Sequence, residues 1–187
     1  MTDYRDIKFN FPTLNLDGTT EASPVEGEMW YDSGKFYLGT SQTFSGVWSS
    51  GGNLSVGKYG PAGAGTQSAG LCIGGFYGGP TTTTEEYNGT AWSIGGAMAT
   101  TRHYLAGCGT QDAALAIGGW IGSFTNSCEE YNGSSWSSAG STSYNIINEA
   151  AAGTVTAGLA MGGYGPLDDT SEYNGTSWSA GGDLTTA

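Results

Sequence analysis

The stretch Ala113-Ala114-Leu115-Ala116-Ile117-Gly118-Gly119 decides the fold, because its pattern occurs three times in the chain of 187 residues. The other copies are Ala69-Gly70-Leu71-Cys72-Ile73-Gly74-Gly75 and Ala157-Gly158-Leu159-Ala160-Met161-Gly162-Gly163. The double glycines stand 44 residues apart at both steps. Short apolar segments that end in turn residues and recur at such a period predict tandem β-units.

A second motif follows each copy downstream and places a tyrosine and a tryptophan at a fixed spacing. In the second repeat it reads Glu130-Tyr131-Asn132-Gly133-Ser134-Ser135-Trp136. Asn-Gly between two strands predicts a two-residue hairpin turn with positive φ angles, so the Tyr and Trp rings should lie against each other across the hairpin. The residues that define the repeat are therefore Gly74, Gly75, Tyr87, Trp92, Gly118, Gly119, Tyr131, Trp136, Gly162, Gly163, Tyr173 and Trp178.

Each repeat divides into four strands. In the second repeat we expect strands over 103–109, 113–117 and 128–131, and a fourth that begins near residue 135. The repeats then span about 53–96, 97–140 and 141–182. With 34 glycines and 23 Trp, Tyr and Phe residues, the composition favours short strands and tight turns over helices.

A double glycine after an apolar strand, followed by Tyr and Trp, resembles the kelch repeat over about residues 53–182. The resemblance implies an all-β fold with four-stranded blades of a β-propeller. The Tyr–Trp interval is shorter than in that family, and the period is 44 rather than about 50. Three blades are fewer than a closed propeller needs. Residues 180–187 match 94–101, the entry into a further blade, so either further repeats or several subunits complete the ring.

The first 50 residues have a different pattern, and we assign them to a small β module separate from residues 51–187. Apolar residues alternate with polar ones in an edge-type strand suited to assembly with another polypeptide: Ile7, Phe9 and Phe11, followed by Leu14 and Leu16. Residues 24–39 predict a hairpin that turns at Asp32-Ser33-Gly34. Glu-Gly-Glu-Met-Trp-Tyr followed by Gly-Lys-Phe-Tyr resembles a motif of bacteriophage tail-fibre and other virion structural proteins. An ordinary hairpin with aromatic cross-strand pairs is the alternative.

The charge balance excludes several kinds of partner. The chain has 17 acidic and 5 basic residues, a net charge of −12, and Arg102 is the single basic residue after residue 60. Nucleic acids and anionic membranes are bound through Lys and Arg, so neither is expected as a partner. No apolar run is long enough for membrane insertion, and the N-terminus lacks a signal-peptide pattern.

Candidate catalytic and metal-binding residues are few. We interpret His103 as a packed histidine, because its equivalents are Tyr59 and Ile147. Cys72, Cys108 and Cys128 suit small buried side chains, without disulfide or metal spacing. We therefore expect no catalytic residue, no metal site, no cofactor and no enzymatic activity.

Three carboxylate pairs lie near the expected third strands. They are Glu85-Glu86, Glu129-Glu130 and Asp168-Asp169. Such pairs suit Ca²⁺ binding or glycan cleavage, but alternation along a strand favours one solvated edge charge in each pair. The N-glycosylation pattern occurs at four asparagines: Asn53, Asn88, Asn132 and Asn174. At the last three, the hairpin turn itself requires Asn-Gly.

Aromatic residues in the variable loops are the candidates for glycan contact. They are Phe76, Tyr77, Trp120 and Tyr164.

Two hypotheses about function follow from the sequence. The first is a bacteriophage virion protein, a tail fibre or appendage, made in the host cytoplasm and extracellular after release. It would join other virion proteins through its N-terminal segment, form a homo-oligomer and contact host-surface glycan. The alternative is a bacterial surface or secreted kelch-like carbohydrate-binding protein or fibre subunit.

Overall fold

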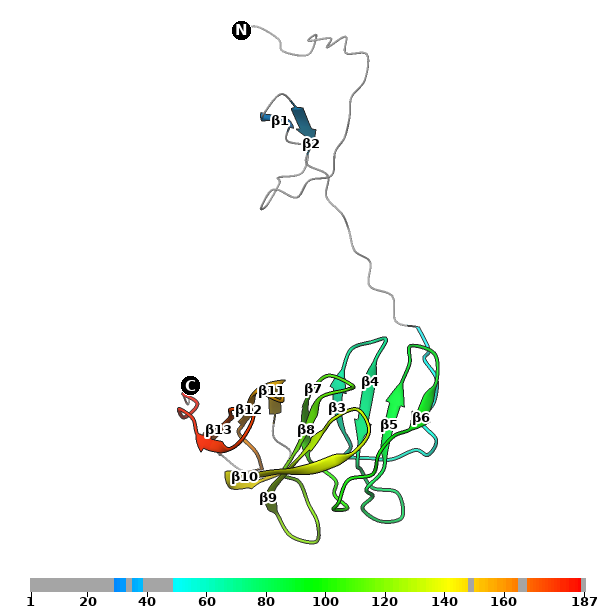
Figure 1. The fold of residues 1–187 in the computed structure, drawn as a ribbon, viewed down its shortest axis with the longest axis vertical. Helices are drawn as coiled ribbons and strands as arrows, with labels where there is room; N and C mark the ends of the chain where they lie inside the picture. The colour runs from blue at the N-terminus through cyan, green and yellow to red at the C-terminus, as the bar shows by residue number, and fades with distance from the viewer. Residues whose placement is uncertain (1–28, 33–34, 39–48, 148–149, 165–167, 186–187) are drawn as a thin grey trace, which may run out of the picture. The chain divides into compact units, whose positions relative to one another are not determined.

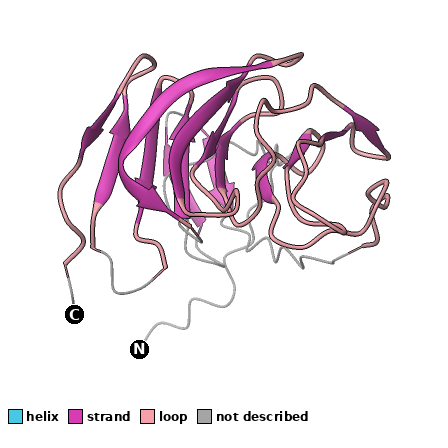
Figure 2. Cartoon of the chain, turned by 90° about the horizontal axis from the view of Figure 1, so that it is seen from below, coloured by secondary structure: helices cyan, strands magenta, loops and turns pink. Residues whose placement is uncertain are grey.

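The computed structural model describes residues 29–32, 35–38, 49–147, 150–164 and 168–185. The chain divides into two compact units, Met1–Ser49 and Ser50–Ala187. Within the described residues the secondary structure consists of strands without helices (Figure 2). The all-β class predicted from the sequence is therefore confirmed.

The first unit contains the hairpin expected over residues 24–39. Strand β1 (Met29–Asp32) pairs with β2 (Lys35–Leu38) in antiparallel register, with Asp32 opposite Lys35 and Met29 opposite Leu38. The predicted assembly strand lies outside the described residues, with all five of its apolar positions: Ile7, Phe9, Phe11, Leu14 and Leu16.

The second unit consists of three four-stranded antiparallel sheets, one for each repeat (Figure 1). In every sheet the strands lie side by side in the order in which they occur along the chain. Sheet 1 comprises β3 (Ala62–Gly65), β4 (Gly70–Ile73), β5 (Thr84–Tyr87) and β6 (Trp92–Ile94). Sheet 2 comprises β7 (Ala106–Gly109), β8 (Ala114–Ile117), β9 (Thr125–Tyr131) and β10 (Trp136–Ile146). Sheet 3 comprises β11 (Ala150–Thr154), β12 (Ala157–Met161), β13 (Thr170–Tyr173) and β14 (Trp178–Ala180).

The first strands of the sheets lie next to one another because their residues are small. β7 contacts both β3 and β11, and Figure 1 shows the three strands in a row. A Cβ atom at Gly107 would stand 3.0 Å from the carbonyl oxygen of Gly63 and 3.1 Å from the Cβ of Ala62. A larger side chain in β7 would therefore push sheets 1 and 2 apart.

Alternation along β8 divides the core into two layers. Leu115 and Ile117 belong to the cluster shared with sheet 3, whereas Ala114 and Ala116 belong to the cluster shared with sheet 1. All four residues are fully buried, so β8 is covered on both faces. Each sheet thus packs face to face with its neighbour, and large residues on one face meet small residues on the next.

The double glycine is required by the backbone where each second strand ends. Gly118 and Gly119 have φ angles of 59° and 102°, which other residues rarely adopt. A Cβ atom at Gly119 would also stand 2.9 Å from the carbonyl oxygen of His103. The corresponding glycines of the other two sheets have positive φ angles as well.

The Asn-Gly turn differs from the two-residue hairpin expected from the sequence. The last pair of the ladder is Tyr131 opposite Trp136, so four residues form the connection. The side-chain Oδ1 of Asn132 accepts hydrogen bonds from the backbone N–H groups of Ser134 (3.0 Å) and Ser135 (2.9 Å). Gly133 alone takes a positive φ, of 86°. The side-chain bonds of Asn thus form an Asx turn, which explains the sequence preference without a type I′ turn.

Strand β10 is longer than expected and runs across the predicted boundary between the second and third repeats. Gly140, with a φ of 75°, lies in a bulge where the register with β9 shifts. Beyond the bulge Ser141 pairs with Ser127 and Ile146 with Thr125. The bulge lets β10 follow the twist of sheet 2 instead of ending near residue 140.

Candidate functional site

Aromatic residues occupy the same place in each repeat, directly after the double glycine. They are Phe76, Trp120 and Tyr164, spaced 44 residues apart. Two of them form antiparallel bridges with the segment that precedes their own sheet, Phe76 with Tyr59 and Trp120 with His103. The loops after β4, β8 and β12 therefore gather aromatic side chains at one end of the sheets, opposite the Asn-Gly turns.

The first group of rings surrounds Phe76. Its ring stacks on Tyr59 with a centroid distance of 5.0 Å and an interplanar angle of 26°. It meets the edge of His103 at 5.2 Å, and His103 lies 4.7 Å from the ring of Tyr104. Tyr104 has a φ of 54°, unusual for a residue with a side chain, and its N–H donates to the carbonyl oxygen of Gly60 at 2.7 Å.

The second group of rings links the loops of sheets 2 and 3. Phe124 meets Trp120 edge to face at 5.1 Å and lies 6.2 Å from Tyr164. The two groups are joined through the backbone, because the N–H of Trp120 donates to the carbonyl oxygen of His103 at 2.8 Å. We call these residues, with Tyr77, the aromatic surface: Tyr59, Phe76, Tyr77, His103, Tyr104, Trp120, Phe124 and Tyr164.

Much of the aromatic surface is open to solvent. Tyr59, Tyr77 and Tyr164 are 53%, 64% and 68% exposed, and Phe76 and Trp120 are half-buried. Exposed aromatic side chains that cluster are typical of binding sites. Of the four residues named from the sequence for glycan contact, Phe76 joins the first ring group and Trp120 and Tyr164 join the second. Tyr77 is exposed beside Phe76 in the chain.

His103 is packed among aromatic rings. It is 7% exposed, and its ring contacts are to Tyr59, Phe76 and Tyr104. Burial lowers the pKa of His103, and a hydrogen bond to the backbone of Trp120 offsets this in part. The imidazole is therefore neutral at neutral pH and contributes to the aromatic surface as a ring.

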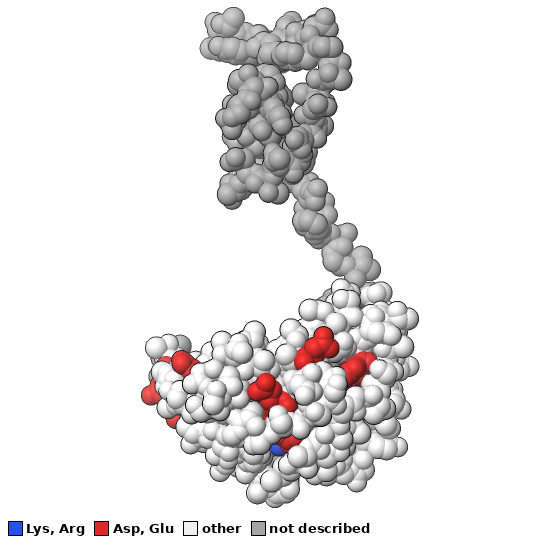
Figure 3. Space-filling view, in the orientation of Figure 1, with Lys and Arg blue, Asp and Glu red and all other residues white. Residues whose placement is uncertain are grey.

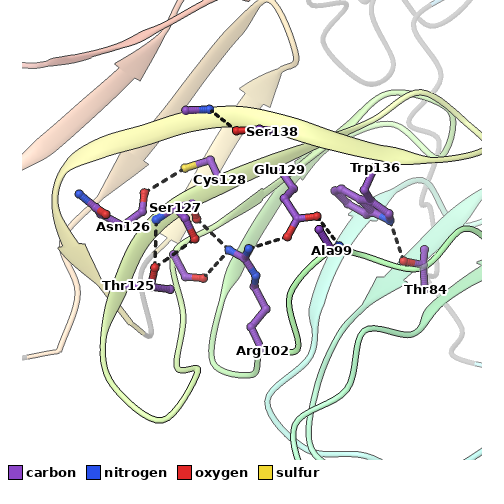
Figure 4. Close-up of polar contacts among 12 residues, drawn as sticks. Thr84, Ala99, Arg102, Thr125, Asn126, Ser127, Cys128, Glu129, Trp136 and Ser138 are labelled. Carbon is purple, nitrogen blue, oxygen red and sulfur yellow. Dashed lines mark hydrogen bonds and ion pairs between the residues drawn. The ribbon is translucent and has the colours of Figure 1, made fainter.

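The carboxylate pairs differ from the expectation of one solvated charge in each. Glu129 is buried and forms an ion pair with Arg102, Nη2 to Oε1 at 2.6 Å (Figure 4). Arg102 Nη1 also donates to the carbonyl oxygens of Gly118 (3.1 Å) and Ser127 (2.8 Å). The second carboxylate oxygen of Glu129 accepts the N–H of Ala99 at 2.7 Å. The pair thus fastens the segment before sheet 2 to β9.

Sheet 1 contains the same arrangement 44 residues earlier. Lys58 Nζ lies 2.8 Å from Glu85 Oε1 and donates to Thr83 Oγ1 at 3.0 Å. The N–H of Ser55 donates to Glu85 Oε2 at 2.7 Å. Burial raises the pKa of Glu85, but the hydrogen bonds from Lys58 and Ser55 outweigh it and hold the pKa below its usual value.

Sheet 3 replaces the ion pair by neutral residues. Ser171 takes the register position of Glu129, and Ile146 stands 44 residues after Arg102. Ser171 is fully buried, and its hydroxyl lies 2.9 Å from that of Ser143. The predicted pair Asp168-Asp169 is exposed and precedes β13, so it is not equivalent to the glutamates of the other sheets.

The second glutamate of each pair joins neighbouring sheets. Tyr131 Oη of sheet 2 donates to Glu86 Oε1 of sheet 1 at 2.5 Å, and Tyr173 Oη of sheet 3 donates to Glu130 Oε2 of sheet 2 at 3.3 Å. Alternation along the strand assigns Glu86 and Glu130 to the solvent side. Both are partly covered because the face of the following sheet packs against them. Glu172, the equivalent in sheet 3, is exposed.

The repeated tyrosines and tryptophans lie as cross-strand pairs, with ring centroids 5.0, 4.9 and 5.0 Å apart in sheets 1, 2 and 3. The tryptophans are half-buried rather than fully buried, because each indole lies at the edge of its sheet. Trp136 Nε1 donates to Thr84 Oγ1 at 2.9 Å and to the carbonyl oxygen of Gly96 at 3.1 Å, so it ties sheet 2 to sheet 1 (Figure 4). Trp92 and Trp178 make the corresponding bonds to Gly52 and Ala139.

The cysteines and the turn asparagines are the remaining residues considered from the sequence, for metal or disulfide chemistry and for glycosylation. Cys72, Cys108 and Cys128 are buried, and burial raises the pKa of Cys108 to about 11. In the described part of the chain no group of three or more His, Cys, Asp and Glu side chains is placed to hold a metal ion. The glycosylation-type residues Asn88, Asn132 and Asn174 are exposed in the turns, and Asn53 is exposed before β3.

No protein-family model and no curated protein matches this chain. Over the ranges that the structure describes, no helix is long and apolar enough to cross a membrane. The function is therefore argued from the geometry of the two units.

Proposed function

We propose that the chain is a structural component of a bacteriophage virion, a tail fibre or similar appendage without catalytic activity. In this proposal the first unit attaches the protein to other virion proteins. Residues Ser50–Ala187 form kelch-like propeller blades and display the aromatic surface to glycan on the host cell.

The arrangement of the three sheets supports the propeller interpretation. Each sheet begins with an Ala- and Gly-rich strand, these first strands lie next to one another, and the later strands follow in sequence order. The same indole and tyrosine hydrogen bonds join sheet 2 to sheet 1 and sheet 3 to sheet 2. Radial repetition of one four-stranded unit is how propellers bury their faces.

The exposed face of sheet 3 supports oligomerisation. Glu86 and Glu130 accept hydrogen bonds from tyrosines of the following sheet. Glu172 occupies the same position in sheet 3 and is exposed. A further blade of the same kind, from a repeat or from another subunit, would cover it in the same way and extend the array toward a ring.

The aromatic surface is the single observation that carries the host-contact role. In a unit whose first strands are rich in Ala and Gly, exposed rings gather at the loop end of all three sheets. Loops on a rigid β scaffold are where binding residues concentrate.

Electron microscopy of whole particles tests the proposal. Antibodies raised against Ser50–Ala187 should label an appendage of the purified virion, and a reconstruction should place a propeller-shaped density at its exposed end. Labelling of a non-viral filament, or recovery of the protein only as a free monomer, would contradict it.

A bacterial surface or secreted carbohydrate-binding protein is the second candidate. It is favoured by the aromatic surface alone, which would serve such a protein equally well. Genes for tail and baseplate proteins beside the coding sequence favour the first candidate, whereas genes for sugar transport favour the second.

A further inference from the structure

The surface of the second unit carries no exposed Lys or Arg. Within residues 50–187 the sequence has these residues only at Lys58 and Arg102. Their side chains are 2% and 1% exposed and are held in the ion pairs with Glu85 and Glu129. The remaining cation-forming side chain, His103, is buried, and burial lowers its pKa.

Acidic side chains are present on the same surface without compensation. Figure 3 shows them at several places on one face of the unit, with one small Lys or Arg patch beside the lowest of them. Asp168 and Asp169, both exposed, stand four and five residues after Tyr164 in the sequence and directly precede β13. Proteins bind carboxylate, sulfate and phosphate groups through Arg, Lys or helix N-termini. The described residues of the second unit offer none of these at the aromatic surface.

The rings themselves have the chemistry to hold an uncharged polar ligand. Tyr59, Phe124 and Tyr164 are 53%, 43% and 68% exposed, and each is fixed by contact with another ring. Fixed rings lose little conformational entropy on binding. The apolar C–H face of a pyranose packs on such a ring face, while its hydroxyl groups remain in water or bond to neighbouring Ser and Thr residues.

We propose that the aromatic surface binds a neutral glycan, a saccharide chain without carboxylate, sulfate or phosphate groups. The aromatic surface then has two adjacent subsites for sugar residues of the same saccharide chain. One is the first ring group (Tyr59 and Phe76), and the other is the second ring group (Trp120, Phe124 and Tyr164). They are joined by the backbone bridge between His103 and Trp120. The inference rests on the glycan-contact role of the proposed function and adds the class of glycan.

Affinity electrophoresis of the full chain under native conditions provides the test. The net charge of −12 carries the protein toward the anode, so binding is read as retardation in gels that contain a polysaccharide. The neutral probes are mannan, galactan, dextran and β-glucan, and the acidic probes are alginate, polysialic acid and heparin. We expect retardation by at least one neutral probe and by no acidic probe. Retardation by acidic probes, or by none of the seven, overturns the inference.

Variants then assign the binding to the rings. Tyr164→Ala and Tyr59→Ala should each weaken binding about tenfold, the loss of roughly one stacking contact. Tyr164→Phe keeps the ring and should bind within about twofold of the unchanged chain, since the hydroxyl contributes little to stacking. Ile94→Ala is the matched control, because Ile94 is 65% exposed on β6 outside the aromatic surface. Equal binding by Tyr164→Ala and Ile94→Ala would overturn the assignment.

Sedimentation of the same variants separates a glycan from a protein occupant. An association of the unchanged chain that Tyr164→Ala abolishes would assign the aromatic surface to self-contact and overturn the inference. The inference and the proposed function fail separately. Absence of the protein from virions contradicts the function alone, whereas a virion protein that binds only acidic glycans contradicts the inference alone.

Discussion

Replacing Arg102 by Met should leave a buried carboxylate without its partner. Arg102 is 1% exposed and lies 2.6 Å from Glu129, whose side chain is 6% exposed. Met matches the aliphatic stem of Arg and carries no charge, so the change removes the guanidinium group with its ion pair and its two hydrogen bonds to backbone carbonyl oxygens. The second oxygen of Glu129 would keep its bond from Ala99.

The expected loss in the free energy of unfolding is about 3–5 kcal/mol, because breaking one side of a buried ion pair strands the other charge. This is a large share of the roughly 5–15 kcal/mol by which a domain is stable. Arg102→Lys should cost only about 1–2 kcal/mol, the loss of hydrogen bonds without loss of charge. Lys58 in sheet 1 shows that an ammonium group serves in this arrangement.

The neutral residues of sheet 3 suggest a double variant that removes both charges of the ion pair in sheet 2. Arg102→Ile with Glu129→Ser copies Ile146 and Ser171, the residues at the corresponding positions. Because no charge is left buried, the double variant should be more stable than either single variant. Urea unfolding followed by tryptophan fluorescence gives the free energy of unfolding of the unchanged chain, the two single variants and the double variant. The double-mutant cycle over these four proteins gives the coupling energy between the two side chains.

Two results would refute this reasoning. A loss below about 1 kcal/mol for Arg102→Met would mean that the pair is solvated like a surface salt bridge. Additive losses in the double variant would mean that the two side chains do not depend on each other.

Other changes test the remaining features. Trp136→Ala should cost about 3 kcal/mol in urea unfolding, since it removes a half-buried indole and its hydrogen bonds to sheet 1, and a loss below about 1 kcal/mol would contradict the packing described. The pKa of His103 is lowered in the folded chain, so the unfolded chain takes up the proton first and stability should fall as pH drops below 6.5. The pKa of Glu85 is lowered too, so the stabilisation from Glu85 is present above pH 4.5 and is lost as pH falls further. Urea unfolding midpoints measured across the pH range check both predictions. A His103→Phe variant should lack the loss of stability below pH 6.5. Deletion of residues 1–20 should leave the three sheets folded by circular dichroism but abolish assembly into the native particle, and normal incorporation would contradict the attachment role.

The order of the strands could be predicted because their signals are local, although β7 (Ala106–Gly109) begins three residues later and β9 (Thr125–Tyr131) three residues earlier than expected. In the second repeat the predicted second strand, 113–117, matches β8 (Ala114–Ile117) within one residue. The hairpin of the first unit was likewise marked by its own turn residues. The Asn-Gly connection was predicted wrongly because the sequence does not show that the Asn132 side chain, rather than its φ angle, forms the turn.

Contacts between distant segments could not be predicted from patterns within one strand. The sequence predicted one solvated carboxylate in the pair Glu129-Glu130 without indicating which, whereas Glu129 is buried and its partner stands 27 residues earlier in the chain. One signal was available, because Lys58 and Arg102 stand 44 residues apart, as do Glu85 and Glu129. The aromatic surface was predicted at its periodic positions. Tyr59, Tyr104 and Phe124 have no aromatic equivalent in every repeat, and only the fold brings them to the same end.

The burial of Lys58 and Arg102 also determines how the second unit meets proteases and chemical labels. Trypsin-like proteases must take a Lys or Arg side chain into their specificity pocket, and both such side chains of this unit are inside ion pairs. Cleavage after either residue therefore requires local or global opening, so its rate reports the population of the opened form. Amine-reactive labels likewise find no accessible lysine between residues 50 and 187. Such labels should therefore leave the aromatic surface chemically intact.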